Sequence, residues 1–401
     1  MSRLLVRNIG ELCTCDSERG DAPGVVKSAA LIAEDGVLTY VGEERGLTRS
    51  LEVDTEIDVD GRSVIPGFVD AHTHIVWLGE RSAEYAQRAA GVSYEQIALG
   101  DGGIATTVRA TTAGTVDALT AAAAERARRM RSCGTTTVEV KSGYGIDTKS
   151  EVRQLEAASA VRALPGVPDI VTTYLPLHAT PDGEHDKHVQ SVIDTGIAEA
   201  RDRATFIDVF CDPMAYSVDE CERVLVAAQN QGMRAKVHAE QRSRNGGALL
   251  AARLGAVSAD HLEHAEDGDL RSLAAASVVC VLLPGAALVL GGPPPPGRRA
   301  LEAGATIAIA TDCNPGTCFC ESMPLMMSLA VATAGITPAQ ALVAATAGGA
   351  AALSLSDRGV LRTGKRCDVA LLTTPHWMDC AYHMGGDVVG GTLVAGESTL
   401  R

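Results

Sequence analysis

The sequence predicts an α/β protein, a (β/α)8 barrel of the TIM type with a small composite β-sandwich domain built from both termini. Three observations predict it: β-type patterns at both chain ends, eight apolar runs between them that alternate with alanine-rich helical stretches, and a length of 401 residues. A barrel alone uses about 250 residues, which leaves room for one small further domain. We expect β-sandwich segments at 1–62 and 356–401 and the barrel at 63–355.

Short strands open and close the chain. Residues 30–33 and 37–41 flank the turn Glu34-Asp35-Gly36, which is a hairpin signal. Three more strand-like segments stand near the other end, at 368–372, 387–389 and 392–394. We expect these two distant parts of the chain to form one β layer.

The central part of the chain contains the expected barrel. Its eight candidate strands lie at 64–69, 135–140, 170–177, 206–210, 234–237, 256–259, 278–283 and 306–310. Two capping boxes mark helices between or after them: Ser217 with Glu220, and Thr337 with Gln340. Eight strands that each lead into a helical stretch predict a closed barrel.

Charge and composition exclude several classes of partner. Lys and Arg number 35 and Asp and Glu 50, so the formal net charge is −15. This charge repels nucleic-acid phosphates and anionic membrane surfaces. The uncharged stretches 273–297 and 322–356 are interrupted by proline and glycine, so we interpret them as buried core elements rather than membrane spans.

The cysteines indicate a reducing compartment. There are eleven, an odd number, with no Cys-x-x-Cys pair and no secretory leader before them, so we expect reduced thiols in a cytoplasmic protein. Cys313, Cys318 and Cys320 cluster together, but without a second pair we interpret them as small buried thiols rather than zinc ligands.

Chemically active side chains follow the predicted strands at their carboxyl ends, where barrels of this kind carry active sites. In chain order these ends carry His72 with His74, Tyr144, His178, Asp212, His238, His261, Pro284 and Asp312. Five of the ten histidines are in this set, which packing alone would not require. We therefore predict a functional site at this end of the barrel.

The pattern favours a metal-dependent hydrolase. His72 and His74 share one face of an extended segment, and His238 with Asp312 completes a ligand set that zinc or ferrous iron accepts with one position open for water. A bound divalent ion lowers the pKa of water towards about 7. Asp312 is the candidate for proton transfer, and His261 for orienting the water or stabilising the oxyanion. The fourth predicted strand offers no lysine to bridge a second ion, so we expect one metal ion.

Simpler structural roles compete with some of these assignments. Arg81 could pair with the neighbouring Glu80 or Glu84, and Tyr144 between two glycines has the pattern of a turn residue. His261 could be a core histidine beside its acidic neighbours. Lys141 is interpreted as an ion-pair partner of Glu139 or a carboxylate binder rather than as a metal bridge.

Several motifs resemble a known family. Residues 64–74 (VIPGFVDAHTH) resemble the opening signature of the amidohydrolase superfamily. Four further motifs resemble those of the imidazolonepropionase family of histidine degradation, at 139–145 (EVKSGYG), 238–241 (HAEQ), 259–262 (ADHL) and 311–317 (TDCNPGT). The resemblance implies metal-dependent hydrolysis of the cyclic amide of 4-imidazolone-5-propanoate to N-formimidoyl-L-glutamate, with zinc or iron as the metal.

The resemblance also implies roles for individual residues. It matches His72, His74, His238 and Asp312 to metal ligands. It matches eight positions to contacts with substrate or product: Arg81, Tyr144, His178, Gln241, His261, Asn314, Gly316 and Thr317. Arg81 offers a bidentate fork for the propanoate carboxylate. We expect the catalytic residues to be Asp312, His261 and Gln241.

The sequence also departs from the family pattern. Gln241 stands where some members carry a glutamate that could act as base, and an amide does not serve as a base, so Asp312 with help from His261 is our candidate. Asp212 replaces an expected glutamate, and the proline-rich segment 285–297 differs from the expected loop. These departures affect substrate contacts and leave the four metal-ligand positions intact.

Two other functions compete. Another amidohydrolase, such as a dihydroorotase-like cyclic amidase or a heteroaromatic deaminase, would use the same ligands with different pocket residues. A metal-free, non-enzymatic scaffold is disfavoured because all the candidate ligands are present. We expect a small anionic substrate, no nucleic-acid or membrane partner, and a homodimer by base rate.

Overall fold

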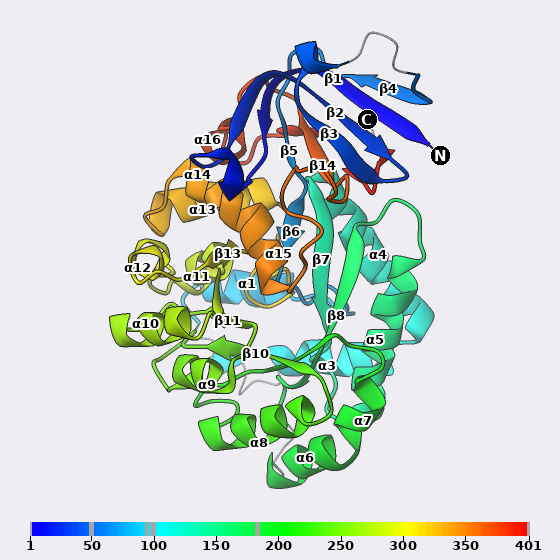
Figure 1. Cartoon of the computed structure of the whole chain (residues 1–401). Coiled ribbons are helices and arrows are strands. Elements are labelled where there is room, and N and C mark those ends of the chain that lie inside the picture. Colours follow the sequence, from blue (N-terminus) through cyan, green and yellow to red (C-terminus); the bar gives the residue numbers. More distant parts are fainter. Residues whose placement is uncertain (1, 48–51, 93–95, 98–101, 181–184, 399–401) are drawn as a thin grey trace.

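The computed structural model describes residues 2–47, 52–92, 96–97, 102–180 and 185–398. Strands from both chain ends form one sheet that lies beyond one end of the barrel (Figure 1). Its strands are β1 (Arg3–Cys13), β2 (Val25–Glu34), β3 (Val37–Glu43), β4 (Thr55–Asp58), β5 (Val64–Pro66), β14 (Val369–Leu372), β15 (Val389–Val394) and β16 (Glu397–Ser398). The expected joint β layer and the predicted β2–β3 hairpin are confirmed.

The barrel strands follow one another in sequence order, and every neighbouring pair is parallel. They are β6 (Phe68–Asp70), β7 (Thr135–Lys141), β8 (Asp169–Leu177), β9 (Phe206–Val209), β10 (Arg234–Ala239), β11 (Ser258–His261), β12 (Val279–Leu282) and β13 (Ile307–Ile309). The predicted (β/α)8 barrel with a small β domain built from both termini is therefore confirmed. The terminal strands, expected as a β-sandwich, are hydrogen-bonded into one sheet. The predicted domain boundaries at 62/63 and 355/356 stay predictions.

Two strand predictions need correction. The single strand expected at 64–69 is two strands, because the chain crosses at Gly67 from the terminal sheet, where β5 pairs with β1 and β14, to the barrel, where β6 pairs with β7. The segments expected at 387–389 and 392–394 form one strand, β15, which continues through Gly390 and Gly391. In both places the pairing partner, rather than the local sequence, decides where the strand ends.

Helices surround the barrel strands (Figure 1). They are α1 (Ser82–Ala89), α3 (Ile104–Ala113), α4 (Val116–Ser132), α5 (Thr148–Arg162), α6 (His185–Ser191), α7 (Ile197–Ala200), α8 (Val218–Gln229), α9 (Gly247–Leu254), α10 (Asp267–Ala275), α11 (Pro284–Leu290), α12 (Gly297–Glu302), α13 (Met323–Thr333), α14 (Pro338–Val343), α15 (Gly349–Ala352) and α16 (Asp379–Tyr382). Two short 3-10 helices are η1 (Ser17–Arg19) and η2 (Glu44–Gly46), and two short π-helical segments are η3 (Val192–Gly196) and η4 (Ala344–Gly348). Both predicted capping boxes are present, at the starts of α8 and α14.

The first and last barrel strands approach each other just beyond their carboxyl ends. The backbone N–H of Asp312 donates to the carbonyl of His72 at 3.0 Å, and that of His74 donates to the carbonyl of Cys313 at 3.0 Å. Asp70 strengthens this closure, because its carboxylate accepts hydrogen bonds from the backbone N–H and the hydroxyl of Thr311. These bonds join two segments that carry predicted ligands.

The remaining expectations about the chain concern its thiols and its uncharged stretches. All eleven cysteines are free thiols, as predicted. Of the helices that the structure describes, none combines the length and the apolar character needed to cross a membrane. The two uncharged stretches instead supply β12, α11, α13 and neighbouring elements, whose apolar side chains are mostly buried.

Closure of the barrel leaves no room for a side chain at Gly349. A Cβ atom there would overlap the carbonyl oxygen of Val69 in β6. We expect Gly349→Ala to lower the free energy of unfolding by about 2–3 kcal/mol, because the added methyl pushes α15 away from β6. Urea denaturation measures this change.

A matched control is Gly268→Ala, at a helical position of α10 where a Cβ atom would meet no atom within 4 Å. It should leave the free energy of unfolding unchanged or raise it by up to about 1 kcal/mol. Equal stability of the two variants would contradict the packing argument.

Candidate active site

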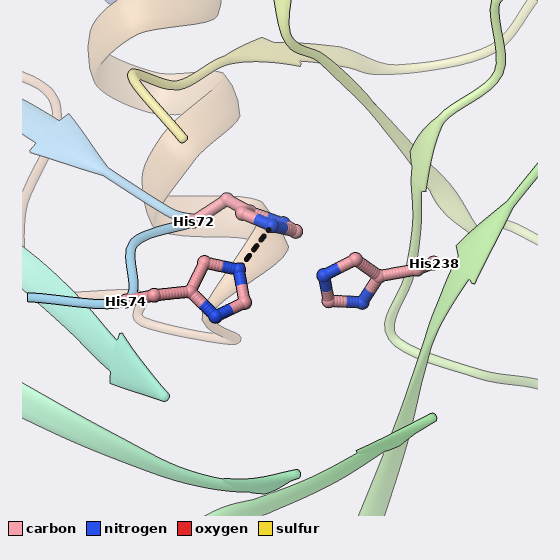
Figure 2. Close-up of side chains that lie close together, drawn as sticks. All are labelled: His72, His74 and His238. Carbon is pink, nitrogen blue, oxygen red and sulfur yellow. Dashed lines mark hydrogen bonds between the residues drawn. The ribbon is translucent and has the colours of Figure 1, made fainter. Parts of the chain in front are cut away.

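Three imidazoles face one another at the carboxyl ends of β6 and β10 (Figure 2). The Nε2 atoms of His72 and His74 lie 3.3 Å apart, and the ring of His238 lies 4.5 Å from that of His72 and 5.5 Å from that of His74, between centroids. One ring nitrogen from each residue lies within 4.8 Å of the others. All three side chains are buried.

The hydrogen-bonding state of these rings fits a metal ion. Nε2 of His238, the ring nitrogen that points towards His72 and His74 in Figure 2, has no hydrogen-bond partner among the described residues. Burying such an atom without a partner costs free energy that a metal–nitrogen bond would offset. Burial, and then neighbouring cationic groups, lower the pKa values of His72 and His74 well below the usual range, so both rings are neutral, the form that binds metals.

Asp312 completes this group from the last strand. Its Oδ1 lies 3.6 Å from the Nε2 atoms of both His72 and His74. Burial raises the pKa of Asp312 to about 6. The four predicted ligands therefore converge, with three nitrogens and one carboxylate, a donor set that suits zinc and iron.

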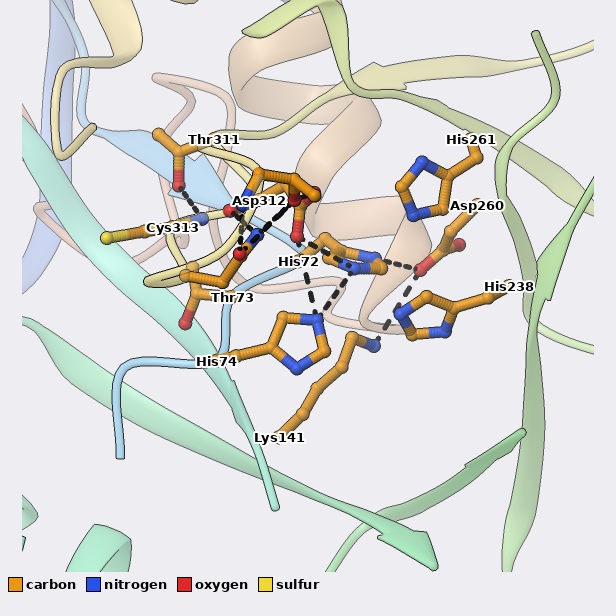
Figure 3. A network of polar contacts seen from close by, with 12 residues as sticks. His72, Thr73, His74, Lys141, His238, Asp260, His261, Thr311, Asp312 and Cys313 are labelled. Atoms are coloured by element: carbon orange, nitrogen blue, oxygen red, sulfur yellow. Dashed lines mark hydrogen bonds and ion pairs between the residues drawn. The ribbon is translucent and has the colours of Figure 1, made fainter. Parts of the chain in front are cut away.

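A buried cluster of five charged side chains contacts this group from inside the barrel: Glu139, Lys141, Asp208, Lys236 and Asp260. Figure 3 shows Asp260 and Lys141 beside the imidazoles. Oδ2 of Asp260 lies 2.6 Å from Nδ1 of His72. Oδ2 of Asp208 lies 3.1 Å from Nδ1 of His238, although without hydrogen-bond geometry. Contacts of this kind set the tautomer and the ring orientation of a metal-binding histidine.

Two lysines neutralise these carboxylates. Lys141 Nζ lies 2.7 Å from Asp208 and 2.8 Å from Glu139, which confirms its predicted pairing with Glu139. Lys236 Nζ lies 2.7 Å from Glu139 and donates to the carbonyl of Ala71, next to His72, at 2.9 Å. Burial alone would lower the pKa of Lys141, but Asp208 and Glu139 raise it, so the lysine stays charged.

Sequence reasoning did not assign roles to Asp208, Lys236 or Asp260 in this cluster. Each lies inside a barrel strand and is fully buried; Asp208 and Lys236 stand between apolar neighbours, and Asp260 stands between Ala259 and His261. A charged residue in an otherwise apolar buried strand was the signal that could have identified them, because such a charge requires a partner.

The predicted substrate-contact residues of strands two and three lie beside the imidazoles. The ring of His178 stacks on that of His74, with centroids 4.9 Å apart, and Tyr144 lies 5.5 Å from His178. Nδ1 of His178 lies 3.0 Å from the carbonyl oxygen of Gly143. Burial lowers the pKa of His178 to about 3, so its ring is neutral at physiological pH.

The segment after Asp312 folds into a compact turn. Oδ1 of Asn314 accepts hydrogen bonds from the backbone N–H groups of Gly316, at 2.8 Å, and Thr317, at 2.7 Å. The hydroxyl of Thr317 lies 3.4 Å from Oδ2 of Asp312. This turn places Asn314, Gly316 and Thr317 beside the candidate metal ligand, as expected of substrate-contact positions.

Arg81 forms the ion pair with Glu84 that the sequence suggested, and it also contacts the turn at Gly316 in the predicted site. Its Nε and Nη2 donate to one carboxylate oxygen of Glu84, at 2.9 and 2.8 Å. A Cβ atom at Gly316 would lie 2.7 Å from Arg81 Nη1, so the guanidinium packs directly against that turn. Arg88, which sequence reasoning missed, donates to the Gly316 carbonyl at 2.9 Å.

The remaining predicted residues lie after β10 and β11. The ring of His261 is 5.5 Å from that of His72 and 5.4 Å from that of His238, between centroids. Gln241 is half-buried, directly after Glu240. The Glu240 carboxylate accepts hydrogen bonds from the backbone N–H groups of Asn245, Gly246 and Ala248. Glu240 therefore holds a loop and is not free to act as a base.

The cysteines near Asp312 do not join the group of three imidazoles found among the described residues. Burial raises the pKa values of Cys313, Cys318 and Cys320, so their side chains are neutral thiols. Their interpretation as small buried thiols is confirmed for Cys313 and Cys318, whereas Cys320 is partly exposed.

Comparison with known proteins agrees with this geometry. The profile of the amidohydrolase family matches residues 63–397. The imidazolonepropionase of Deinococcus deserti is 41% identical over 409 residues, which cover 99% of each chain. The imidazolonepropionase of Salinispora arenicola is 41% identical over 407 residues, which cover 100% of each chain.

Solved structures share the fold at lower sequence identity. A zinc-bound adenosine deaminase from Xanthomonas campestris has a TM-score of 0.71 and 20% identity, over 100% of this chain and 93% of that one. A triazine hydrolase variant has a TM-score of 0.73 and 17% identity, over 100% of this chain and 95% of that one. The fold, the converging strand-end residues and the full-length relatives lead to one conclusion. The chain belongs to the amidohydrolase superfamily and, within it, to the imidazolonepropionase family.

Proposed function

We propose that this chain hydrolyses the cyclic amide of 4-imidazolone-5-propanoate and releases N-formimidoyl-L-glutamate, a step of histidine degradation. The observation that carries the proposal is the convergence of His72, His74 and His238 at one end of the barrel, with the Asp312 carboxylate 3.6 Å from the first two. Full-length relatives named imidazolonepropionase support the choice of substrate.

The proposed cofactor is one zinc or iron ion, held by the three imidazoles and the Asp312 carboxylate. Such an ion lowers the pKa of water and supplies hydroxide at neutral pH. The unpartnered Nε2 of His238, which points towards the other two imidazoles, supports this placement. The donor set itself does not discriminate between the two metals.

The protein's own groups would move the protons of the reaction. Water adds to the ring carbonyl carbon, the carbon–nitrogen bond breaks, and the leaving nitrogen takes a proton. Asp312, whose Oδ2 faces Thr317, is placed to accept the proton of the attacking water and pass it to that nitrogen. His261, across the imidazole group, is placed to orient the water.

The substrate's carboxylate requires a separate cationic site, because the chain has a formal net charge of −15. Arg81 packs against the turn at Gly316 and is buried, so its guanidinium keeps a fixed direction. The rings of Tyr144 and His178 lie 6.1 and 4.9 Å from that of His74, between centroids. We propose that the propanoate binds Arg81 and that the ring lies between these residues and the imidazoles.

Metal dependence is the first test. We expect a chelator to abolish ring opening, and zinc or iron to restore it. His238→Ala should lose stoichiometric metal, as measured by elemental analysis of purified protein, because one of the three imidazoles is gone. His376→Ala removes an exposed histidine and should retain the metal. A full metal complement in the His238 variant would contradict the assignment.

The role of the buried charges can be tested at Asp260. Asp260→Asn keeps the shape of the side chain and removes its charge next to His72. We expect zinc affinity, measured by competition with a chelator, to fall about 10- to 100-fold while the circular dichroism spectrum is retained.

The matched control is Asp368→Asn, which changes another buried carboxylate, one paired with Arg366 on the terminal sheet. Its zinc affinity should match that of the unmodified protein. If Asp260→Asn also binds zinc with unchanged affinity, the orienting role is wrong.

Substrate binding by Arg81 predicts a specific kinetic signature. Arg81→Ala should raise KM about 10- to 100-fold and change kcat much less, because a charge-assisted bond to the substrate carboxylate is worth about 1.5–3 kcal/mol. Steady-state ring-opening assays measure both constants. Arg299→Ala, which removes an arginine of α12 that pairs with Asp267, should change neither. A large loss of kcat at constant KM would rule out this role.

A further inference from the structure

Glu263 is a buried carboxylate that the proposed mechanism does not use. It lies two residues beyond the end of β11 and is buried. Neither of its carboxylate oxygens has a hydrogen-bond partner among the described residues. Burying an unpartnered carboxylate is costly, so this placement indicates a partner that engages it during function.

The nearest candidate partner is His261. Its Nδ1 also lacks a hydrogen-bond partner and lies 3.7 Å from Oε1 of Glu263. Both side chains are 2% exposed, so water does not readily substitute for either group. A shift of less than 1 Å would bring the two atoms within hydrogen-bond distance.

The backbone between the two residues is strained in a way that brings them together. His261 has φ 82° and Leu262 has φ 71°, and two successive non-glycine residues in the left-handed region are rare. Two backbone hydrogen bonds hold this turn, from Leu262 to Ala239 and from His264 to Glu240. The turn directs the side chain of Glu263 back towards the ring of His261.

The orientation of His261 completes the geometry. In Figure 3 one ring nitrogen of His261 points towards His72 and His238, and the other points away from them. The ring nitrogen next to Cγ, Nδ1, is the one near Glu263. A proton held on Nδ1 by the carboxylate leaves the lone pair of Nε2 directed at the reacting centre.

We propose that Glu263 is a positioning residue that accepts a hydrogen bond from Nδ1–H of His261 and thereby holds Nε2 towards the attacking water. The same arrangement of a carboxylate behind an imidazole orients the base in other hydrolases. The proposal rests on the proposed hydrolysis, in which His261 orients the water. No proton leaves Glu263 and no additional reactant is required.

A double-mutant cycle tests the pairing. Glu263→Gln should lower kcat about 10- to 100-fold with little change in KM, in stoichiometric zinc or in thermal unfolding temperature. In a His261→Ala background the same substitution should have no further effect on kcat, because the group that it positions is already absent.

A matched control is Glu240→Gln, which alters a buried carboxylate that holds backbone N–H groups. Glu240→Gln should change kcat by the same factor in the unmodified enzyme and in the His261→Ala background. Full kcat in Glu263→Gln, or a fold-change independent of His261, would overturn the proposal.

A spectroscopic measurement separates this proposal from the proposed function. In zinc-loaded protein with 15N-labelled histidine, the ring nitrogens of His261 should show a proton on Nδ1, and Glu263→Gln should shift the ring towards a mixture of tautomers. Absence of ring opening by the unmodified enzyme would contradict the proposed function alone. A tautomer that Glu263→Gln leaves unchanged would contradict the role of Glu263 alone.

Discussion

The contact between the first and last barrel strands is the constraint on which the site depends. Asp312 donates its backbone N–H to His72, and His74 donates to Cys313, at 3.0 Å in both cases. These bonds bring two segments from opposite ends of the barrel sequence into register. Because side-chain directions follow the backbone closely at strand ends, this register places the Asp312 carboxylate opposite the two imidazoles.

The buried charges inside the barrel orient the histidine rings of the site. Glu139, Lys141, Asp208, Lys236 and Asp260 are all fully buried. Replacing such a cluster with apolar side chains of similar volume is often neutral or stabilising in other proteins, so hydrophobic packing does not explain its presence. Its contacts with His72, His238 and the carbonyl of Ala71 give it a role in directing the rings that converge above it.

Backbone strain is also present at the site. Glu240, His261, Leu262 and Asp312 all have positive φ values. Glu240 and Leu262 directly follow a barrel strand, His261 ends one, and Asp312 lies three residues beyond β13. Strained backbone conformations of this kind persist where several surrounding hydrogen bonds hold them in place. Here those bonds come from neighbouring strand ends, so the rigidity of the barrel maintains the conformations that aim His261 and Asp312 into the site.

The sequence by itself determined the order of strands and helices, the strand-end positions of His72, His74, His238, His261 and Asp312, and the family. These features are local. Apolar periodicity predicts a strand, and a residue that follows the strand in sequence lies at its carboxyl end. The tertiary structure decided where β5 gives way to β6, and it decided the partners of Asp208, Lys236, Asp260 and Glu263. Those partners lie on different strands, and their distances depend on barrel closure and on the turn after His261, which no short stretch of sequence encodes.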